Sequence, residues 1–154
     1  MKNIRQKLLI EQADRKVAAL QPLAELAPPP KGWIAAIRTA LRMSLRQLGE
    51  RLGISAQSVK ELEQREVSGA ITLNSLKEAA RAMDMKLVYG FVPKEESLEK
   101  MIEKKAYELA EEIVMRTSQS MKLEDQEVSY QRLKKSIKDK ADEIKTSMPR
   151  HLWD

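Results

Sequence analysis

The chain has 154 residues, no cysteine and one histidine, and 33% of its residues are charged while 4% are aromatic. This composition excludes disulfide frameworks, thiolate metal sites and thiol nucleophiles, and it argues against histidine-based catalysis, so we expect no enzyme, metal or cofactor. The formal net charge is +5, of which residues 31–92 carry +4 and residues 93–154 carry −1. A basic middle segment suits a polyanionic partner, although charge alone fits a solvated surface better.

Residues 1–31 are predicted to form a helical arm followed by a stiff linker. Apolar residues recur at helical spacing through residues 4–20, and three consecutive prolines, Pro28 to Pro30, then stop any helix. No apolar run approaches the roughly 20 residues of a membrane span, and acidic residues interrupt the first apolar stretch. We therefore expect a cytoplasmic protein with no membrane partner.

Residues 32–85 are predicted to contain four short helices. The first covers residues 33–43, and Gln47 completes a capping box at the start of the second, which Gly53 ends. The predicted N-caps of the second and third helices are Ser44 and Ser55, and a loop leads to Thr72 before the fourth helix.

Residues 86–154 are predicted to contain one strand followed by helices. Residues 86–92 are β-branched and aromatic and end at Pro93, a pattern that indicates a short strand. An isolated strand needs a partner. Two apolar stripes at helical spacing follow in residues 94–148, and we expect the polar residues 117–120 to separate them. Trp153, after Pro149, is expected to belong to a C-terminal tail.

Residues 45–64 match the pattern of a helix-turn-helix. Two helices that cross steeply need a very small residue at their closest approach and a turn residue that tolerates positive φ, for which the sequence offers Gly49 and Gly53. The residues expected to seal the crossing are Leu48, Leu52, Ile54, Val59 and Leu62. An ordinary helical hairpin is the alternative. It is less favoured, because Gly49 costs roughly 1 kcal/mol relative to Ala inside a helix and needs a reason.

On these residues the stretch 33–84 resembles the Xre, or lambda-repressor-like, helix-turn-helix domain, a compact five-helix DNA-binding module. The resemblance implies that the helix at 55–65 enters the major groove. It also implies a partly buried ion pair between Arg38 and Glu63. The chain departs from the family at Leu45, where a phosphate-binding Gln is common.

Most of the chain also resembles a narrower family, called mobile mystery protein A. The stretches that carry this resemblance are GWIAAIR (32–38), LVYGFVP (87–93) and SMKLEDQ (120–126). The resemblance implies a regulator encoded on a mobile element beside a Fic-domain protein. The fold class that follows is all-α, with a lambda-repressor-like domain, an N-terminal helical arm, one short strand and C-terminal helices.

The third helix of the motif is expected to read the DNA. Gln57 suits adenine, Lys60 suits guanine, and Ala56 could meet a thymine methyl group. The residues predicted to contact DNA are Arg46, Ser55, Ala56, Gln57, Ser58, Lys60, Glu61, Arg65 and Thr72. Of these, Arg46, Arg65 and Thr72 would contact the phosphate backbone, although a solvated side chain fits them equally well.

The function expected from the sequence is a repressor-type regulator that binds a palindromic operator in double-stranded DNA as a homodimer. Leu87, Tyr89 and Phe91 of the predicted strand would contribute to the dimer interface or accept a strand from another protein. The alternative is an antitoxin-like protein that neutralises a Fic-domain partner through its C-terminal helices or its N-terminal arm.

Overall fold

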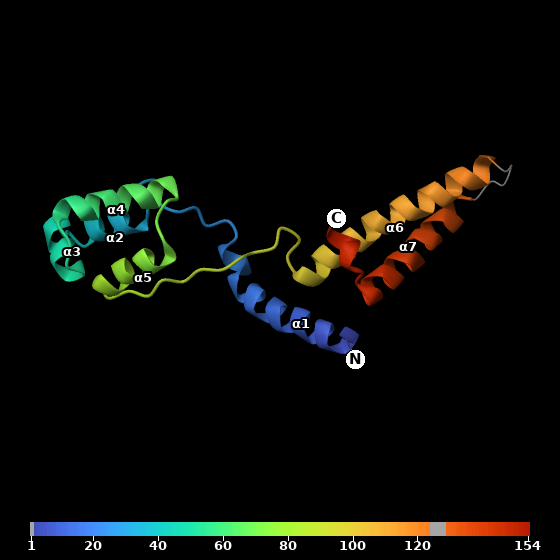
Figure 1. Ribbon diagram of the computed structural model, residues 1–154, viewed down its shortest axis with the longest axis horizontal. Helices are drawn as coiled ribbons and strands as arrows, with labels where there is room; N and C mark the ends of the chain where they lie inside the picture. Colours follow the sequence, from blue (N-terminus) through green and yellow to red (C-terminus); the bar gives the residue numbers. More distant parts are fainter. Residues whose placement is uncertain (1, 124–128) are drawn as a thin grey trace. The chain divides into compact units, whose positions relative to one another are not determined.

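The computed structural model describes residues 2–123 and 129–154, and the stretch 120–126 therefore ends outside the described residues. The described chain is all-α, as the composition predicts, and it divides into two units (Figure 1). One unit is Glu25–Tyr89, and the other joins Met1–Ala24 to Gly90–Asp154. None of the described helices combines the length and the apolar character needed to cross a bilayer.

The unit Glu25–Tyr89 contains the four helices expected for residues 32–85. Their bounds are α2 Trp33–Ala40, α3 Leu45–Leu52, α4 Ala56–Ser68 and α5 Leu73–Ala82. A hydrogen-bonding side chain caps each of α3, α4 and α5. The buried residues of its core come from all four helices and the turn that follows them, and they are Ile34, Leu48, Val59, Leu62, Ala79 and Met83. These short helices are therefore stabilised by one shared core.

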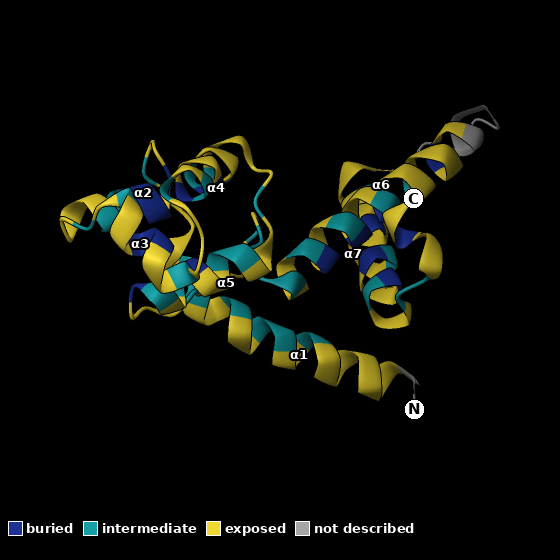
Figure 2. Cartoon of the chain, turned by 60° about the vertical axis from the view of Figure 1, so that its left-hand side comes forward, coloured by how far each residue is buried: buried dark blue, intermediate teal, exposed yellow. Residues whose placement is uncertain are grey.

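The described residues of the second unit form three helices and two short 3₁₀ segments. Their bounds are α1 Lys2–Leu20, η1 Gln21–Leu23, α6 Leu98–Leu123, α7 Tyr130–Ser147 and η2 Arg150–Trp153. The two long helices, α6 and α7, pack side by side (Figures 1 and 2). The buried residues along their seam are Ile102, Ala106, Ala110, Ile137, Ala141, Ile144 and Leu152. Alanines in the middle of both helices allow them to approach closely.

The polar residues 117–120 do not interrupt the helix, contrary to expectation, because α6 continues to Leu123. Thr117 donates its hydroxyl hydrogen bond to the carbonyl oxygen of Ile113, one turn earlier, at 3.1 Å. Ser118 is buried. Hydroxyl groups that bond within the helix in this way are compatible with its continuation.

Helix α1 belongs to the same unit as the C-terminal helices, whereas the sequence predicts a separate arm. Asp14 of α1 accepts hydrogen bonds from the backbone amides of Leu98 (2.7 Å) and Glu99 (3.2 Å), at the start of α6. The C-terminal tail also joins this unit, since Leu152 in η2 lies in the core while Trp153 stays exposed. Sequence periodicity cannot reveal these attachments, because each depends on one side chain reaching a distant segment.

The strand predicted for residues 86–92 does not form. This segment has no regular secondary structure, and the described residues contain no strand with which it could pair. The physical reason is that a strand is stabilised by hydrogen bonds to a neighbouring strand, which the described part of this chain does not supply.

Candidate nucleic-acid interface

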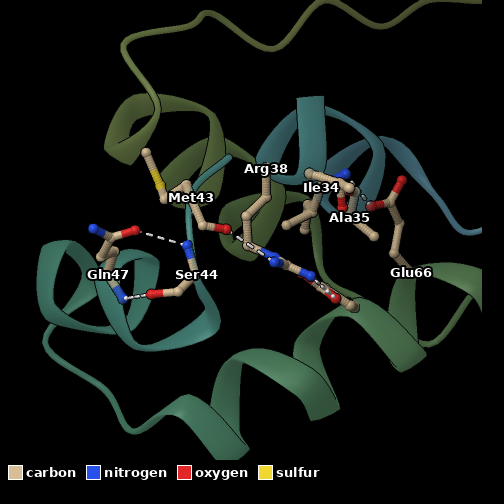
Figure 3. Close-up of polar contacts among 9 residues, drawn as sticks. Ile34, Ala35, Arg38, Met43, Ser44, Gln47 and Glu66 are labelled. Atoms are coloured by element: carbon tan, nitrogen blue, oxygen red, sulfur yellow. Dashed lines mark hydrogen bonds and ion pairs between the residues drawn. The ribbon is translucent and has the colours of Figure 1, made fainter. Parts of the chain in front are cut away.

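Helix α3 begins at a capping box and ends at a glycine. Ser44 accepts a hydrogen bond from the amide of Gln47 at 3.0 Å, and the side chain of Gln47 accepts one from the amide of Ser44 at 2.8 Å, which completes the predicted capping box (Figure 3). Gly53 ends α3 at φ +73°, in the left-handed region that glycine adopts at little cost. Both ends of α3 are therefore set by local residues.

Gly49 lies at the closest approach between α3 and the turn that leads to α4. A Cβ atom at this position would lie 2.6 Å from the carbonyl oxygen of Ile54 and 3.3 Å from backbone atoms of Ser55. Since those atoms belong to the backbone, a side chain at position 49 would force the turn and α4 away from α3. The glycine that appears costly in sequence is thus required by the packing.

Helix α4 has one buried face and one exposed polar face. Val59 and Leu62 are buried in the core of the unit. The exposed residues that share the other side are Gln57, Lys60, Glu61, Gln64 and Arg65. Ala56 and Ser58 are half-buried. Four of the residues predicted to read or contact DNA from α4 are therefore accessible on one helix.

The remaining predicted contacts take part in caps or surface pairs. Ser55 donates to the hydroxyl of Ser58 at 2.9 Å and caps α4, and Thr72 caps α5 in the same way. Arg46 lies 3.7 Å from Glu50, with both side chains largely exposed. A surface pair of this kind contributes little free energy, so Arg46 can exchange its partner at low cost.

The ion pair expected between Arg38 and Glu63 is present and partly buried. The Nε of Arg38 donates to Oε1 of Glu63 at 2.5 Å, and their side chains are 16% and 12% exposed. The same guanidinium group donates to the carbonyl oxygen of Met43 at 3.0 Å (Figure 3). Arg38 therefore links α2, the segment before α3, and α4, which holds α4 in a defined orientation.

Sequence reasoning missed a second carboxylate on α4. Glu66 accepts hydrogen bonds from the amides of Trp33 (2.6 Å) and Ile34 (2.9 Å), the first residues of α2. Figure 3 shows the Glu66 carboxylate beside Ile34. Gly32 precedes them with φ +85°, and a Cβ atom there would lie 2.8 Å from the Glu66 carboxylate. Glu66 is more than 30 residues away from these amides, so no spacing rule indicates it. The glycine before a helix that lacks a local cap is the only sequence signal.

The predicted interface residues of 86–92 differ in exposure. Tyr89 and Phe91 are exposed, and Leu87 is half-buried. The ammonium group of Lys77 in α5 lies 5.8 Å from the centre of the Tyr89 ring. Tyr89 and Phe91 are therefore accessible, whereas Leu87 is partly covered.

Comparisons of the chain with protein-family models, curated proteins and solved structures find no match. Within residues 2–123 and 129–154 no group of histidine and acidic residues is arranged to hold a metal ion.

Proposed function

We propose that the chain is a sequence-specific DNA-binding regulator of the lambda-repressor-like type, with α4 as its recognition helix. The observation that carries the proposal is the tight α3–α4 crossing at Gly49, beside an exposed polar face on α4. A helix-turn-helix needs both features, because the second helix must project from the protein while its inner face stays packed.

The polar face of α4 provides groups suited to the major groove. Gln57 would make two hydrogen bonds to adenine, Lys60 would donate to the acceptors of guanine, and Glu61 would accept from the amino group of cytosine. Ala56 at the start of the helix would meet a thymine methyl group. Ser55 and Ser58, which bond to each other in the free chain, would offer their remaining hydrogen-bonding capacity near the same end.

Phosphate contacts would position the unit without reading sequence. The first amides of α3, those of Leu45 and Arg46, precede the first hydrogen bonds of the helix and suit an anion. Arg46 would leave Glu50 for a phosphate, and Arg65 and Thr72 would add contacts on either side of the recognition helix. With Leu45 in place of Gln, backbone amides replace a side-chain contact at that position.

Binding as a homodimer would place two recognition helices in successive major grooves, about 34 Å apart. A palindromic operator would follow from this two-fold symmetry, and a binding site in the chain's own promoter would make the regulation autogenous. The affinity should fall steeply with salt, since cations are released from the duplex when basic side chains neutralise phosphates.

The test begins with selection of a binding site from random duplexes. Affinities are then measured by fluorescence anisotropy for the selected duplex and for an unrelated one. Gln57→Ala and Lys60→Ala should each weaken binding to the selected duplex by about 1–3 kcal/mol and change binding to the unrelated duplex much less. The matched controls are Gln131→Ala and Lys138→Ala, exposed residues of α7 that remove the same side chains from the other unit.

Two results would contradict the proposal. If no duplex is enriched, the chain does not recognise a DNA sequence. If Gln57→Ala and Lys60→Ala weaken both duplexes equally, α4 contacts DNA without reading its bases.

A second candidate function, binding and neutralising a Fic-domain protein, is favoured by a groove of about 1430 Å³ beside α1, α6 and α7. The apolar residues that line it include Ile4, Leu9, Ile10, Ile102 and Met148. Co-expression with a Fic-domain enzyme followed by size-exclusion chromatography tests this function. Leu9→Asp should abolish co-elution and Gln57→Ala should preserve it, whereas separate elution of the two wild-type proteins would exclude the complex.

A further inference from the structure

Residues 86–92 have an unusual combination of strand-forming sequence and unpaired backbone. Among the hydrogen bonds of the described residues, none involves a backbone amide or carbonyl group of this segment. The side chains of Val88, Tyr89 and Phe91 are 68%, 64% and 91% exposed. Unpaired backbone groups beside exposed apolar side chains are typical of an edge that pairs with another chain.

The position of Pro93 determines which edge of the segment is free to pair. Successive residues of a strand direct their amide and carbonyl groups to opposite edges, and proline has no amide hydrogen to donate. Pro93 shares its edge with Leu87, Tyr89 and Phe91, so that edge is interrupted. Lys86, Val88, Gly90 and Val92 use the other edge, which has every donor and acceptor.

One face of the segment is contacted within the chain at a single position, Gly90. A Cβ atom at Gly90 would overlap the side chain of Leu20, at the end of α1, so Leu20 packs directly on the backbone there. A two-stranded ribbon alone is marginally stable in water. Support from Leu20 on one face, and aromatic pairs on the other, would supply the additional apolar contacts that such a ribbon needs.

Charges select the register of a symmetric antiparallel pair. If two copies meet with Tyr89 opposite Tyr89, then Leu87 faces Phe91, Val88 faces Gly90, and Lys86 faces the uncharged Val92. A shift that places Gly90 at the centre would instead put Lys86 opposite Lys94, and like charges in that position are destabilising. The sequence therefore favours the register centred on Tyr89.

We propose that residues 86–92 form an antiparallel two-stranded ribbon with the same segment of a second copy, in the register centred on Tyr89. The inference rests on the homodimer of the proposed function and specifies its interface. Val88 and Gly90, and likewise Lys86 and Val92, exchange backbone hydrogen bonds between the two copies. Tyr89 pairs with Tyr89, and Leu87 with Phe91, at the closer positions that lack hydrogen bonds.

Disulfide trapping tests the register, because the chain has no cysteine of its own. Full-length Tyr89→Cys should form a covalent dimer rapidly under copper–phenanthroline and air, since opposite Cα atoms lie about 4.5–5.5 Å apart. Phe91→Cys is the matched control. It is the more exposed position, yet its two copies would lie about 13 Å apart along the ribbon and should not react. A mixture of Leu87→Cys and Phe91→Cys chains should form the mixed dimer.

Charge variants provide a second readout that needs no cross-link. Val92→Lys places a like charge opposite Lys86 in this register and should weaken the dimer about three- to tenfold in sedimentation equilibrium, and adding Lys86→Glu should restore most of that loss. Lys86→Glu, which faces Val92 in this register, should have little effect. In the register centred on Gly90 it would strengthen the dimer.

A monomeric wild-type chain at every concentration would overturn the proposal, as would equal cross-linking of Tyr89→Cys and Phe91→Cys. A dimer that Lys86→Glu strengthens would overturn the register. These failures are distinguishable from failure of DNA binding, because a monomer can still recognise a half-site with α4. Conversely, loss of DNA binding leaves the cross-linking pattern unchanged.

Discussion

In each unit, a carboxylate from a distant helix covers the amino end of another helix. Glu66 accepts hydrogen bonds from the first two amides of α2, and Asp14 accepts them from the first two amides of α6. The two helices differ in whether a local side chain also caps them. Gly32 gives α2 no side-chain cap, whereas Ser97 accepts a hydrogen bond from the amide of Lys100 in α6 at 3.1 Å.

A carboxylate at the start of a helix can therefore contribute differently to the stability of two helices. The amides of a helix start need acceptors, and α2, with eight residues, depends on one carboxylate for them. Helix α6 has 26 residues, a local cap and a long seam with α7. We therefore expect the unit Glu25–Tyr89 to be more sensitive to loss of single polar contacts.

The two tryptophans allow each unit to be followed separately. Trp33 begins α2 in one unit, and Trp153 lies in η2 of the other. In a Trp153→Phe background, fluorescence during urea unfolding reports on Glu25–Tyr89, and in a Trp33→Phe background it reports on the other unit. The free energy of unfolding of each unit is obtained from the transition of its own tryptophan.

The largest expected effect is that of a cavity in one core. Leu48 is fully buried, and Leu48→Ala should lower the stability of Glu25–Tyr89 by about 3 kcal/mol, because it removes apolar contacts and leaves a void. Ile144→Ala is the matched change in the other unit, with a loss of similar size. Each variant should move only the transition of its own tryptophan, and a joint shift of both would mean that the units unfold together.

The two carboxylate caps, Glu66 and Asp14, should differ in how much they contribute to stability. Glu66→Ala should lower the free energy of unfolding of Glu25–Tyr89, followed by Trp33 fluorescence, by about 2 kcal/mol, since two amides of α2 lose their acceptor. Asp14→Ala should lower the free energy of unfolding of the other unit, followed by Trp153 fluorescence, by about 1 kcal/mol or less, because Ser97 still accepts a hydrogen bond at the start of α6. Equal losses would show that the local cap of α6 contributes little.

Gly49→Ala should lower the stability of Glu25–Tyr89 by about 1–2 kcal/mol. The added methyl group meets the backbone of Ile54, a cost that exceeds the gain in helix propensity. Gly53→Ala is the control, since its Cβ would have free space and only its positive φ opposes the change, at about 1 kcal/mol. An unchanged or raised stability of Gly49→Ala would mean that the crossing of α3 and α4 is looser than the structure shows.

The smallest expected effect concerns Lys145 of α7. Hydrogen bonds from its ammonium group to Glu103 (2.6 Å) and Glu99 (3.2 Å) raise the pKa of Lys145 above its ordinary value of 10.5. Its stabilisation is thus present at neutral and mildly alkaline pH and is lost as the pH rises through the raised folded-state pKa. Lys145→Met should cost less than about 1 kcal/mol at pH 7, and the difference from wild type should shrink above pH 10.5. A difference that grows with pH would contradict this.

Much of the unit Glu25–Tyr89 could be predicted because the caps and the turn that bound its helices involve only nearby residues. The capping box of Ser44 and Gln47, the caps Ser55 and Thr72, and the turn at Gly53 each act within four residues. The exposed face of α4 follows from helical periodicity in the same way. The continuity of α6 through residues 117–120 was mispredicted, since polar residues end a helix only when their side chains compete with its backbone.

The sequence by itself determined the all-α class, the starts of α3, α4 and α5, the need for a small residue at Gly49 and the need for a residue that tolerates positive φ at Gly53, because these depend on nearby residues of the chain. Only the tertiary structure decided that Glu66 and Asp14 accept hydrogen bonds from helices far away in the chain, and that residues 86–92 have no partner strand among the described residues. Such contacts depend on where distant segments meet in space, and no spacing in the sequence encodes that meeting.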